Sequence, residues 1–189
     1  MSLNINFINE EFIKSRTAVS VGIDGKQLKP VIKLAQDKYI LPALGSNLYN
    51  RLQAGVENDD LNLKEIDLMN NYIADALLWF TMGELVTMTS FQFFSKGVFQ
   101  KTSEESNAPS KGQLELLERR YISNGEFYKQ RLIDFLRANE QDYPQYLSGV
   151  AELDTIAPQM QAYTSPIFLG RKGKRIVSNY DYPCEIKKL

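Results

Sequence analysis

The sequence contains no histidine, and this absence removes the commonest general base and the commonest transition-metal ligand. Di-metal centres built from helical Glu-x-x-His pairs are therefore excluded. The sequence has one cysteine, Cys184, so an intrachain disulfide, a cysteine-rich zinc site and an iron–sulfur cluster are excluded as well. We interpret Cys184 as a free thiol in a reducing compartment, because a catalytic cysteine would need a basic partner such as histidine.

Long hydrophobic runs and a strong excess of charge are also missing. Apolar stretches are interrupted well short of membrane-spanning length, and the N-terminus MSLNINFINEEF has no basic segment followed by an apolar run. The formal net charge of -1 disfavours a protein that coats nucleic acid. We therefore expect a soluble protein, made in the cytoplasm and without a membrane partner, whose 43% hydrophobic residues bury a sizeable core.

Helical periodicity begins near the N-terminus, where NEEFIKSR predicts a short helix. The next helix begins after Asp24, whose side chain suits an N-cap. Pro30 fits the first turn of that helix, where a missing N–H costs nothing. Pro42 and Gly45 are expected to end it.

Two further helices have recognisable starts. Ser46 can cap a short helix that stops at Gly55. Ser110 and Gln113 form a capping-box pattern that begins a long helix running to about Asn139. The inner face of this long helix is predicted to comprise Leu114, Leu117, Tyr121, Tyr128, Leu132, Phe135 and Leu136.

The segment 63–90 is the longest periodic stretch, and the capping-box pattern of Asn62 and Glu65 opens it. Its apolar stripe is wide, and Trp79 and Met82 widen it further. A helix that is apolar on more than one face is buried on more than one side. It is therefore either the central helix of a bundle or a helix that a neighbouring subunit also covers.

The stretch FQFFSKGVFQKTSEES separates the two long helices and combines four phenylalanines with a polar end. These phenylalanines either close one end of the bundle or lie on a loop that packs against another subunit, where aromatic anchors carry much of the binding energy. We expect the first ones in the core, and we assign Phe94, Val98 and Phe99 to a subunit interface together with Trp79 and Met82.

The character of the sequence changes from about Leu153, where helical periodicity stops. PIFL and RIVS flank GRKGK, which predicts a hairpin or an extended arm. From Ser165 onward six Lys/Arg stand against two Asp/Glu, a net charge of +4, whereas the rest of the chain is net acidic. The apolar pieces of this arm are assigned to a subunit interface, namely Ile167, Phe168, Leu169, Ile176 and Val177. The basic cluster is assigned to a contact with DNA or with an acidic neighbour, and it comprises Arg171, Lys172, Lys174 and Arg175.

Catalytic motifs are not found. Gly170 and Gly173 lack the strand–loop–helix setting of a phosphate-binding loop, and no G-x-S-x-G elbow is present. We therefore predict a protein that is not an enzyme and needs neither cofactor nor metal. The predicted architecture is all-α: an antiparallel helical bundle with two long helices and a projecting loop over residues 1–150, then an extended, partly β-like C-terminal arm over residues 151–189.

The order of these elements resembles that of head–tail connector proteins of tailed bacteriophages. The resemblance covers roughly residues 25–145, where YILPALGSNLYNRL ends the first helix and is followed by a long helix, a KGV loop, a second long helix and YPQYL. The family's turn motif corresponds here to Leu44, Gly45, Leu48 and Tyr49. The likeness is nearest to the adaptor or ring proteins of crAss-like and other Bacteroidetes phages.

The resemblance implies a structural virion protein, assembled in the bacterial host cytoplasm and located at the portal vertex. It implies a homo-oligomeric ring, typically a dodecamer, that joins the portal protein to the next ring or tail protein and lines the DNA channel. Non-specific contact with packaged DNA would go with the basic cluster. The alternative is a non-enzymatic cytosolic binding or regulatory module that forms a small closed oligomer. The long basic arm favours the connector, because a regulatory module has little use for it.

Overall fold

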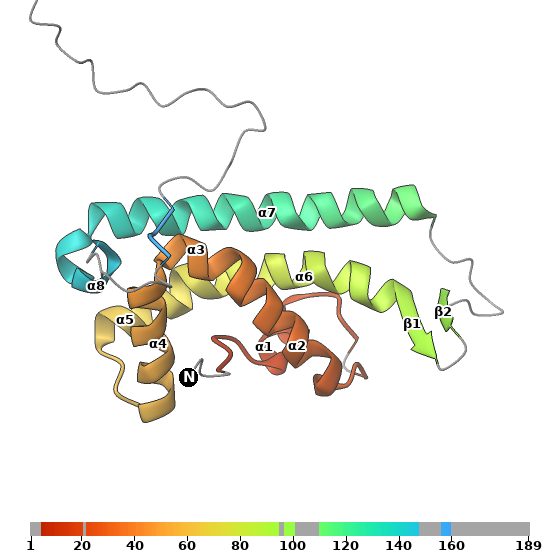
Figure 1. Cartoon of the computed structure of the whole chain (residues 1–189), viewed down its shortest axis with the longest axis horizontal. Coiled ribbons are helices and arrows are strands. Elements are labelled where there is room, and N and C mark those ends of the chain that lie inside the picture. The colour runs from red at the N-terminus through yellow and green to blue at the C-terminus, as the bar shows by residue number, and fades with distance from the viewer. Residues whose placement is uncertain (1–4, 21, 95–96, 101–109, 148–155, 160–189) are drawn as a thin grey trace, which may run out of the picture.

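The computed structural model is mostly helical, which confirms the predicted all-α character (Figure 1). The structure describes residues 5–20, 22–94, 97–100, 110–147 and 156–159, and for 89–94 and 97–100 it describes the backbone.

Two short N-terminal helices begin where the sequence predicts. Helix α1 (Glu10–Arg16) has Asn9 as its N-cap, and helix α2 (Gly25–Ala35) has Asp24, whose carboxylate accepts a hydrogen bond from a backbone N–H of the first turn. The prediction for Pro30 was wrong, because this proline lies inside α2 beyond the first turn.

Helix α2 continues through a π-helical turn, η1 (Gln36–Ile40), into the short helix α3 (Leu41–Leu44). Pro42 therefore does not end the helix as predicted. The wider turn closes with the N–H of Leu41 donating to the carbonyl of Gln36, so the chain passes the proline without breaking. Gly45, with φ of 76°, does end it.

The prediction of Ser46 as an N-cap was wrong: the N-cap of helix α4 (Ser46–Asn58) is Gly45, no side chain caps the helix, and Ser46 Oγ accepts from the N–H of Ile156 instead. The helix also runs past Gly55, where the sequence pattern placed its end. The helix instead ends at Asp59, which adopts the left-handed conformation that aspartate tolerates better than most residues. Gly55 serves packing, because a Cβ there would lie 2.4 Å from the Leu61 side chain.

The predicted helix over 63–90 is one helical rod with a π-helical turn inside it. It consists of α5 (Leu63–Leu68), η2 (Met69–Ile73) and α6 (Ala74–Ser90). The capping box of Asn62 and Glu65 is present in full.

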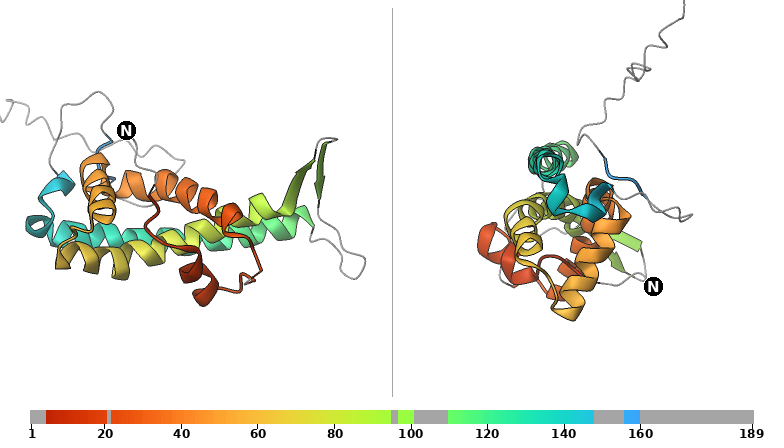
Figure 2. Two further views of the ribbon diagram at one scale, coloured as in Figure 1. Left: turned by 90° about the horizontal axis from the view of Figure 1, so that it is seen from below. Right: turned by 90° about the vertical axis from the view of Figure 1, so that its left-hand side faces the viewer.

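The second capping box, of Ser110 and Gln113, is also present and opens α7 (Lys111–Ala138). Helices α6 and α7 lie side by side in opposite directions and set the long axis of the molecule (Figures 1 and 2). Two short strands that pair in antiparallel fashion, β1 (Phe91–Phe94) and β2 (Gly97–Gln100), extend this helical pair at one end. At the other end, η3 (Glu140–Asp142) and α8 (Pro144–Leu147) follow α7.

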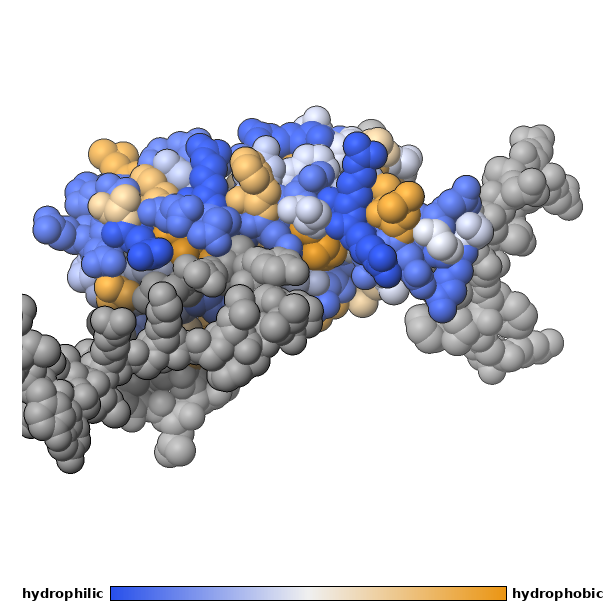
Figure 3. All heavy atoms as spheres, turned by 90° about the horizontal axis from the view of Figure 1, so that it is seen from above, coloured by the Kyte–Doolittle hydropathy of each residue, from blue (hydrophilic) through white to orange (hydrophobic). Residues whose placement is uncertain are grey.

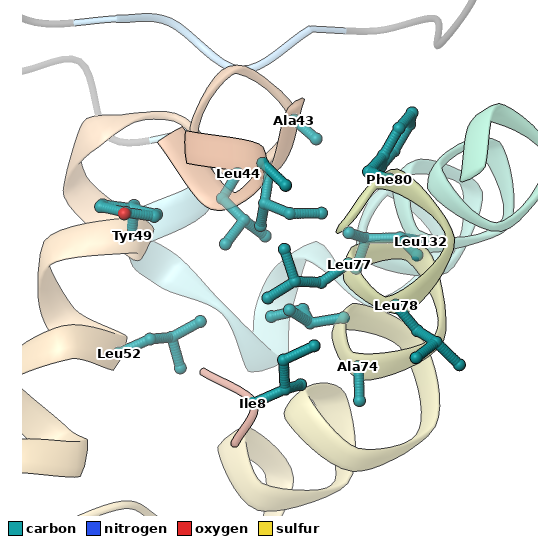
Figure 4. Packing of buried hydrophobic residues seen from close by; sticks show 14 of the residues in the cluster. Ile8, Ala43, Leu44, Tyr49, Leu52, Ala74, Leu77, Leu78, Phe80 and Leu132 are labelled. Atoms are coloured by element: carbon teal, nitrogen blue, oxygen red, sulfur yellow. The ribbon is translucent and has the colours of Figure 1, made fainter. Parts of the chain in front are cut away.

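Helix α6 is covered on more than one side by its own chain, since it packs against both α7 and α2. Figure 4 shows Leu77 pointing toward Leu44 and Ile8, which come from distant parts of the sequence. The close approach of α7 depends on Gly125, where a Cβ would lie 2.7 Å from the Phe80 ring. Phe80 itself is fully buried and stacks on Tyr39 at a ring-centroid distance of 4.0 Å.

The inner face predicted for α7 is correct over its C-terminal half, where Leu132 and Leu136 are fully buried. Toward the N-terminal end of α7 the prediction fails, because Leu117 is 40% exposed. The other described helices do not extend as far along the long axis, so among the described helices α7 has only α6 beside it there (Figure 1).

Tyr143 makes stability sensitive to alkaline pH. Its hydroxyl donates to the carbonyl of Lys64 at 2.9 Å, and burial, with Asp67 nearby, raises its pKa to about 12. Since the unfolded pKa is about 10, this contribution is intact below about pH 10 and is lost as pH rises toward 12. We expect Tyr143→Phe to be less stable at pH 7 by about 1 kcal/mol, and to lose less stability than the wild type between pH 10 and 12. Urea unfolding across this pH range measures the difference, and parallel losses in both proteins would contradict the assignment.

Candidate interaction surfaces

The turn between α3 and α4, residues 42–46, is here called the elbow, and an extended segment of the C-terminal region crosses it. The backbone N–H of Ser46 donates to the carbonyl of Ile156 at 2.9 Å, and the Ile156 N–H donates to Ser46 Oγ at 2.8 Å. Three residues further on, the N–H of Gln159 donates to the carbonyl of Pro42 at 2.8 Å. The segment Ile156–Gln159 is thus anchored at both of its ends.

Gly45 allows this segment to approach. Its φ of 76° and ψ of 158° lie in a region that only glycine occupies without strain. A Cβ at this position would also lie 2.8 Å from Cδ of Pro158 and 3.2 Å from the carbonyl oxygen of Ile156. Backbone conformation and close contact therefore both require glycine at the elbow.

Lys129 reaches the same segment from α7. The residue is 6% exposed, and its Nζ donates to Oε1 of Gln159 at 3.2 Å. Burial lowers the pKa of this lysine, and Glu126 opposes the effect in part. Within the described residues Lys129 has no ion pair, so a neutral amide oxygen is the acceptor that the structure provides.

A second extended segment, residues 5–7, is held by a polar network around Tyr49. Gln36 donates to the carbonyl of Ile5 at 3.0 Å and accepts from the N–H of Phe7 at 2.8 Å, so its amide pairs with the backbone as a neighbouring strand would. The Tyr49 hydroxyl accepts from Gln36 at 2.9 Å and donates to Asp37 at 2.6 Å. Burial and the Asp37 carboxylate raise the pKa of Tyr49, so it remains a neutral donor at neutral pH.

Six of the nine exposed large apolar side chains among the described residues belong to elements at the two ends of the molecule, and Leu34, Phe127 and Ile156 lie between them. The distal surface lies where α6 ends and α7 begins, and it comprises Met88, Leu116 and Leu117, which are 51%, 70% and 40% exposed. The proximal surface lies near the start of α5 and in α8, and it comprises Leu63, Ile66 and Leu147. Figure 3 shows hydrophobic side chains separated by hydrophilic ones along the face that it presents.

The interface residues predicted on α6 are partly used within the chain. Met82 is 8% exposed and belongs to the core, and the Trp79 ring lies 5.9 Å from that of Tyr121. Phe94 pairs with Gly97 at the turn end of the two strands, but its side chain is outside the described part of the structure. Subunit contact by these residues stays a prediction.

Val98 and Phe99 lie on β2, opposite Phe93 and Gln92, and their side chains too are outside the described part. The remaining predicted site residues all fall within 160–189, which the structure does not describe. These are Ile167, Phe168, Leu169, Ile176, Val177, Arg171, Lys172, Lys174 and Arg175.

Sequence reasoning missed several surface residues that the structure brings forward. Leu116 and Phe127, which is 68% exposed, are separated by three helical turns and so lie on the same outward side of α7. That spacing was readable in the sequence. The partnership of Lys129 and Gln159 had no sequence signal, because thirty residues separate the two side chains.

Two absences characterise the part of the chain that the structure describes. None of its helices is long and apolar enough to cross a membrane. It also brings together no group of three or more acidic, histidine or cysteine side chains able to hold a metal ion.

These features define a mostly helical protein in which a long pair of helices, α6 and α7, extends beyond the core. The elbow and the two extended segments, residues 5–7 and 156–159, pack at this core. The protein belongs to a family of unknown function, DUF6712, whose match covers residues 40–150, more than half of the chain. That stretch includes the elbow and both long helices. No curated protein and no solved structure matches the chain.

Proposed function

We propose that this protein is a structural virion protein, a head–tail connector subunit that forms a ring beneath the portal and lines the DNA channel. The order of elements that carries the resemblance to phage connectors supports the proposal. The turn motif of that resemblance lies at the elbow, where Leu44 and Leu48 are fully buried and Gly45 takes a positive-φ conformation that only glycine adopts without strain. The motif therefore serves a structural purpose in this chain, as expected of a scaffold protein.

The observation that carries the proposal is the separation of the distal and proximal surfaces. A ring is built from heterologous contacts, so each subunit needs two different adhesive faces. A closed dimer needs one face that pairs with itself. Leu116 at one end is 70% exposed and Leu63 at the other is 85% exposed, which gives the protomer two such candidates (Figure 1).

The rest of the proposal concerns partners. The ring is homo-oligomeric, with the portal protein above and the next ring or a tail protein below. Residues 151–189 form the arm: Ile156–Gln159 binds the elbow of its own chain, the part beyond it docks on a neighbour, and the basic cluster contacts the neighbour or packaged DNA. The subunit acts without a cofactor and is not an enzyme. Its body over residues 1–150 ends where the family match ends, which supports this division of the chain.

Co-expression with the portal protein encoded in the same genome tests the proposal. We expect the two proteins to co-purify and negative-stain images to show rings, with a mass that fits many copies of this chain. Because a portal can template the ring, the chain alone can remain monomeric without contradicting the proposal. A dimer that ignores the portal would instead support the closed regulatory module.

The distal surface gives a sharper test of the same proposal. We expect Leu116→Ser with Leu117→Ser to reduce the ring fraction by about tenfold or more, because buried interface leucines each contribute roughly 1–3 kcal/mol. The substituted side chains are exposed in the protomer, so its helical circular dichroism is expected to stay unchanged. Leu34→Ser, at a residue 39% exposed on α2, is the matched control. Mass photometry of the co-expressed complexes gives the readout, and equal ring fractions in all three proteins would remove the distal surface from the interface.

A further inference from the structure

We propose that the elbow is a recognition site for an extended peptide that carries a Pro-Gln pair, and that the chain's own Ile156–Gln159 occupies this site. This inference does not depend on the proposed connector function. It rests on the three hydrogen bonds between the segment and the elbow, two to main-chain groups and one to Ser46 Oγ, on the contact of Pro158 with Gly45, and on the buried ammonium of Lys129.

The elbow offers main-chain groups that the helices leave free. The N–H of Ser46 is at the start of α4 and the carbonyl of Pro42 is near the end of α3, positions where intrahelical partners are missing. These two groups and Ser46 Oγ bind the backbone of a segment at its first and fourth residues. Capture through main-chain groups is how extended peptides are commonly bound, whatever their side chains.

The third position of the bound segment is selected by shape. Pro158 lies against Gly45, at the place where any larger residue of the elbow would put its Cβ. Proline also restricts itself and the residue before it to extended conformations, so such a segment loses less entropy on binding. Proline is therefore favoured over other residues at this position.

The fourth position is selected by Lys129. Its nearly buried ammonium needs an acceptor, and the Gln159 side chain supplies an oxygen at 3.2 Å. An apolar side chain in place of glutamine would leave this cation without that acceptor. The fourth position therefore requires a side-chain acceptor oxygen within reach of Lys129, which Gln159 supplies, and the lowered pKa of Lys129 is consistent with the ammonium being enclosed.

The segment is held mainly by polar contacts, which makes its docking reversible. Ile156 is 40% exposed, and Ala157 and Gln159 are exposed as well. Since little apolar surface is buried, most of the affinity comes from hydrogen bonds of modest net strength. The covalent link keeps the segment at high effective concentration, so a separate peptide of the same pattern competes poorly until the tethered one is disabled.

The experiment uses the full-length chain and a fluorescent peptide of residues 154–161, DTIAPQMQ. In an opened variant, Pro158→Gly and Gln159→Lys weaken the tethered segment while the elbow itself is unchanged. We expect fluorescence anisotropy to show binding to the opened variant, and affinity for the wild type to be lower by about tenfold or more. Failure of the peptide to bind the opened variant, or equal affinity for both proteins, would overturn the proposal.

Two controls test whether Lys129 determines which peptide binds. Adding Lys129→Met to the opened variant is expected to weaken peptide binding by about tenfold, since a charge-assisted hydrogen bond is lost. A second peptide has leucine at the position of Gln159. We expect it to bind the opened variant more weakly than DTIAPQMQ does, but to bind the form that also carries Lys129→Met no worse than DTIAPQMQ does. Equal binding of both peptides to the opened variant would show that Lys129 does not select the ligand. Circular dichroism verifies that each variant is folded, and the readout needs no ring, so it fails or succeeds independently of the connector proposal.

Discussion

Replacing Gly45 with alanine is expected to lower the free energy of unfolding by about 2–3 kcal/mol. The backbone at this residue has φ of 76° and ψ of 158°, which an L-amino acid with a Cβ adopts only under strain. The new methyl group would also meet Cδ of Pro158 at 2.8 Å, so the docked segment has to move. Urea unfolding measures the loss, and hydrogen exchange at residues 156–159 measures the release of the segment.

Gly112 supplies the matched control for this substitution. It lies in the first turn of α7, has no positive φ, and a Cβ there would find nothing within 4 Å. Gly112→Ala is expected to be neutral or to stabilise by up to about 1 kcal/mol through helix propensity. Gly45→Ala combined with Pro158→Gly separates the two causes. Full recovery in this double variant would show that the contact alone matters and that backbone strain contributes nothing.

Replacing Arg51 with methionine is expected to lower the free energy of unfolding by about 3 kcal/mol. The guanidinium binds both carboxylate oxygens of Glu65 at 3.0 Å and reaches Asp60 at 2.7 Å. Glu65 is 4% exposed and also accepts the N–H of Asn62, so it holds the start of α5. Without Arg51 its charge would be buried with no cation to balance it. Chemical unfolding of the purified variant measures the loss.

An exposed arginine provides the comparison. Arg16 pairs with Asp75 at 3.3 Å, and its side chain is 54% exposed. Arg16→Met is expected to cost less than about 1 kcal/mol, because solvent screens such a pair. Adding Glu65→Gln to Arg51→Met is expected to restore part of the stability, since the unbalanced charge is removed while an acceptor remains for Asn62. Equal losses for the two arginine variants would contradict the view that burial of Glu65 sets the cost.

Helix starts were predictable because their signals are local. Asp24, Asn62 and Ser110 each cap a helix through a backbone N–H two or three residues away, and both predicted capping boxes are present. Helix ends were less predictable. Pro42 was expected to break a helix that instead widens into a π turn, and Gly55 was expected to end a helix in which it makes room for Leu61. In both cases packing elsewhere outweighed the local preference.

At the candidate site, too, local features were predictable from the sequence and contacts between distant residues were not. The turn motif around Gly45 was visible in the sequence, and the structure gives its physical meaning as a glycine-only conformation. The segment Ile156–Gln159 lies in the part of the chain that was expected to be an extended arm, but nothing in its composition indicated contact with the elbow. Lys129 occupies an ordinary helical position, so its burial depends on what the rest of the chain places over it.

By itself, then, the sequence determined the helical class, the starts of the helices, the wide apolar face of α6 and the absence of histidine and disulfide chemistry. These follow from signals that act within a few residues along the chain. Only the tertiary structure decided that α6 is covered by its own chain, that Leu116 and Leu63 remain exposed at opposite ends, and that Lys129 meets Gln159. Such features depend on which distant segments pack together, because burial is a property of the whole fold and no local pattern encodes it.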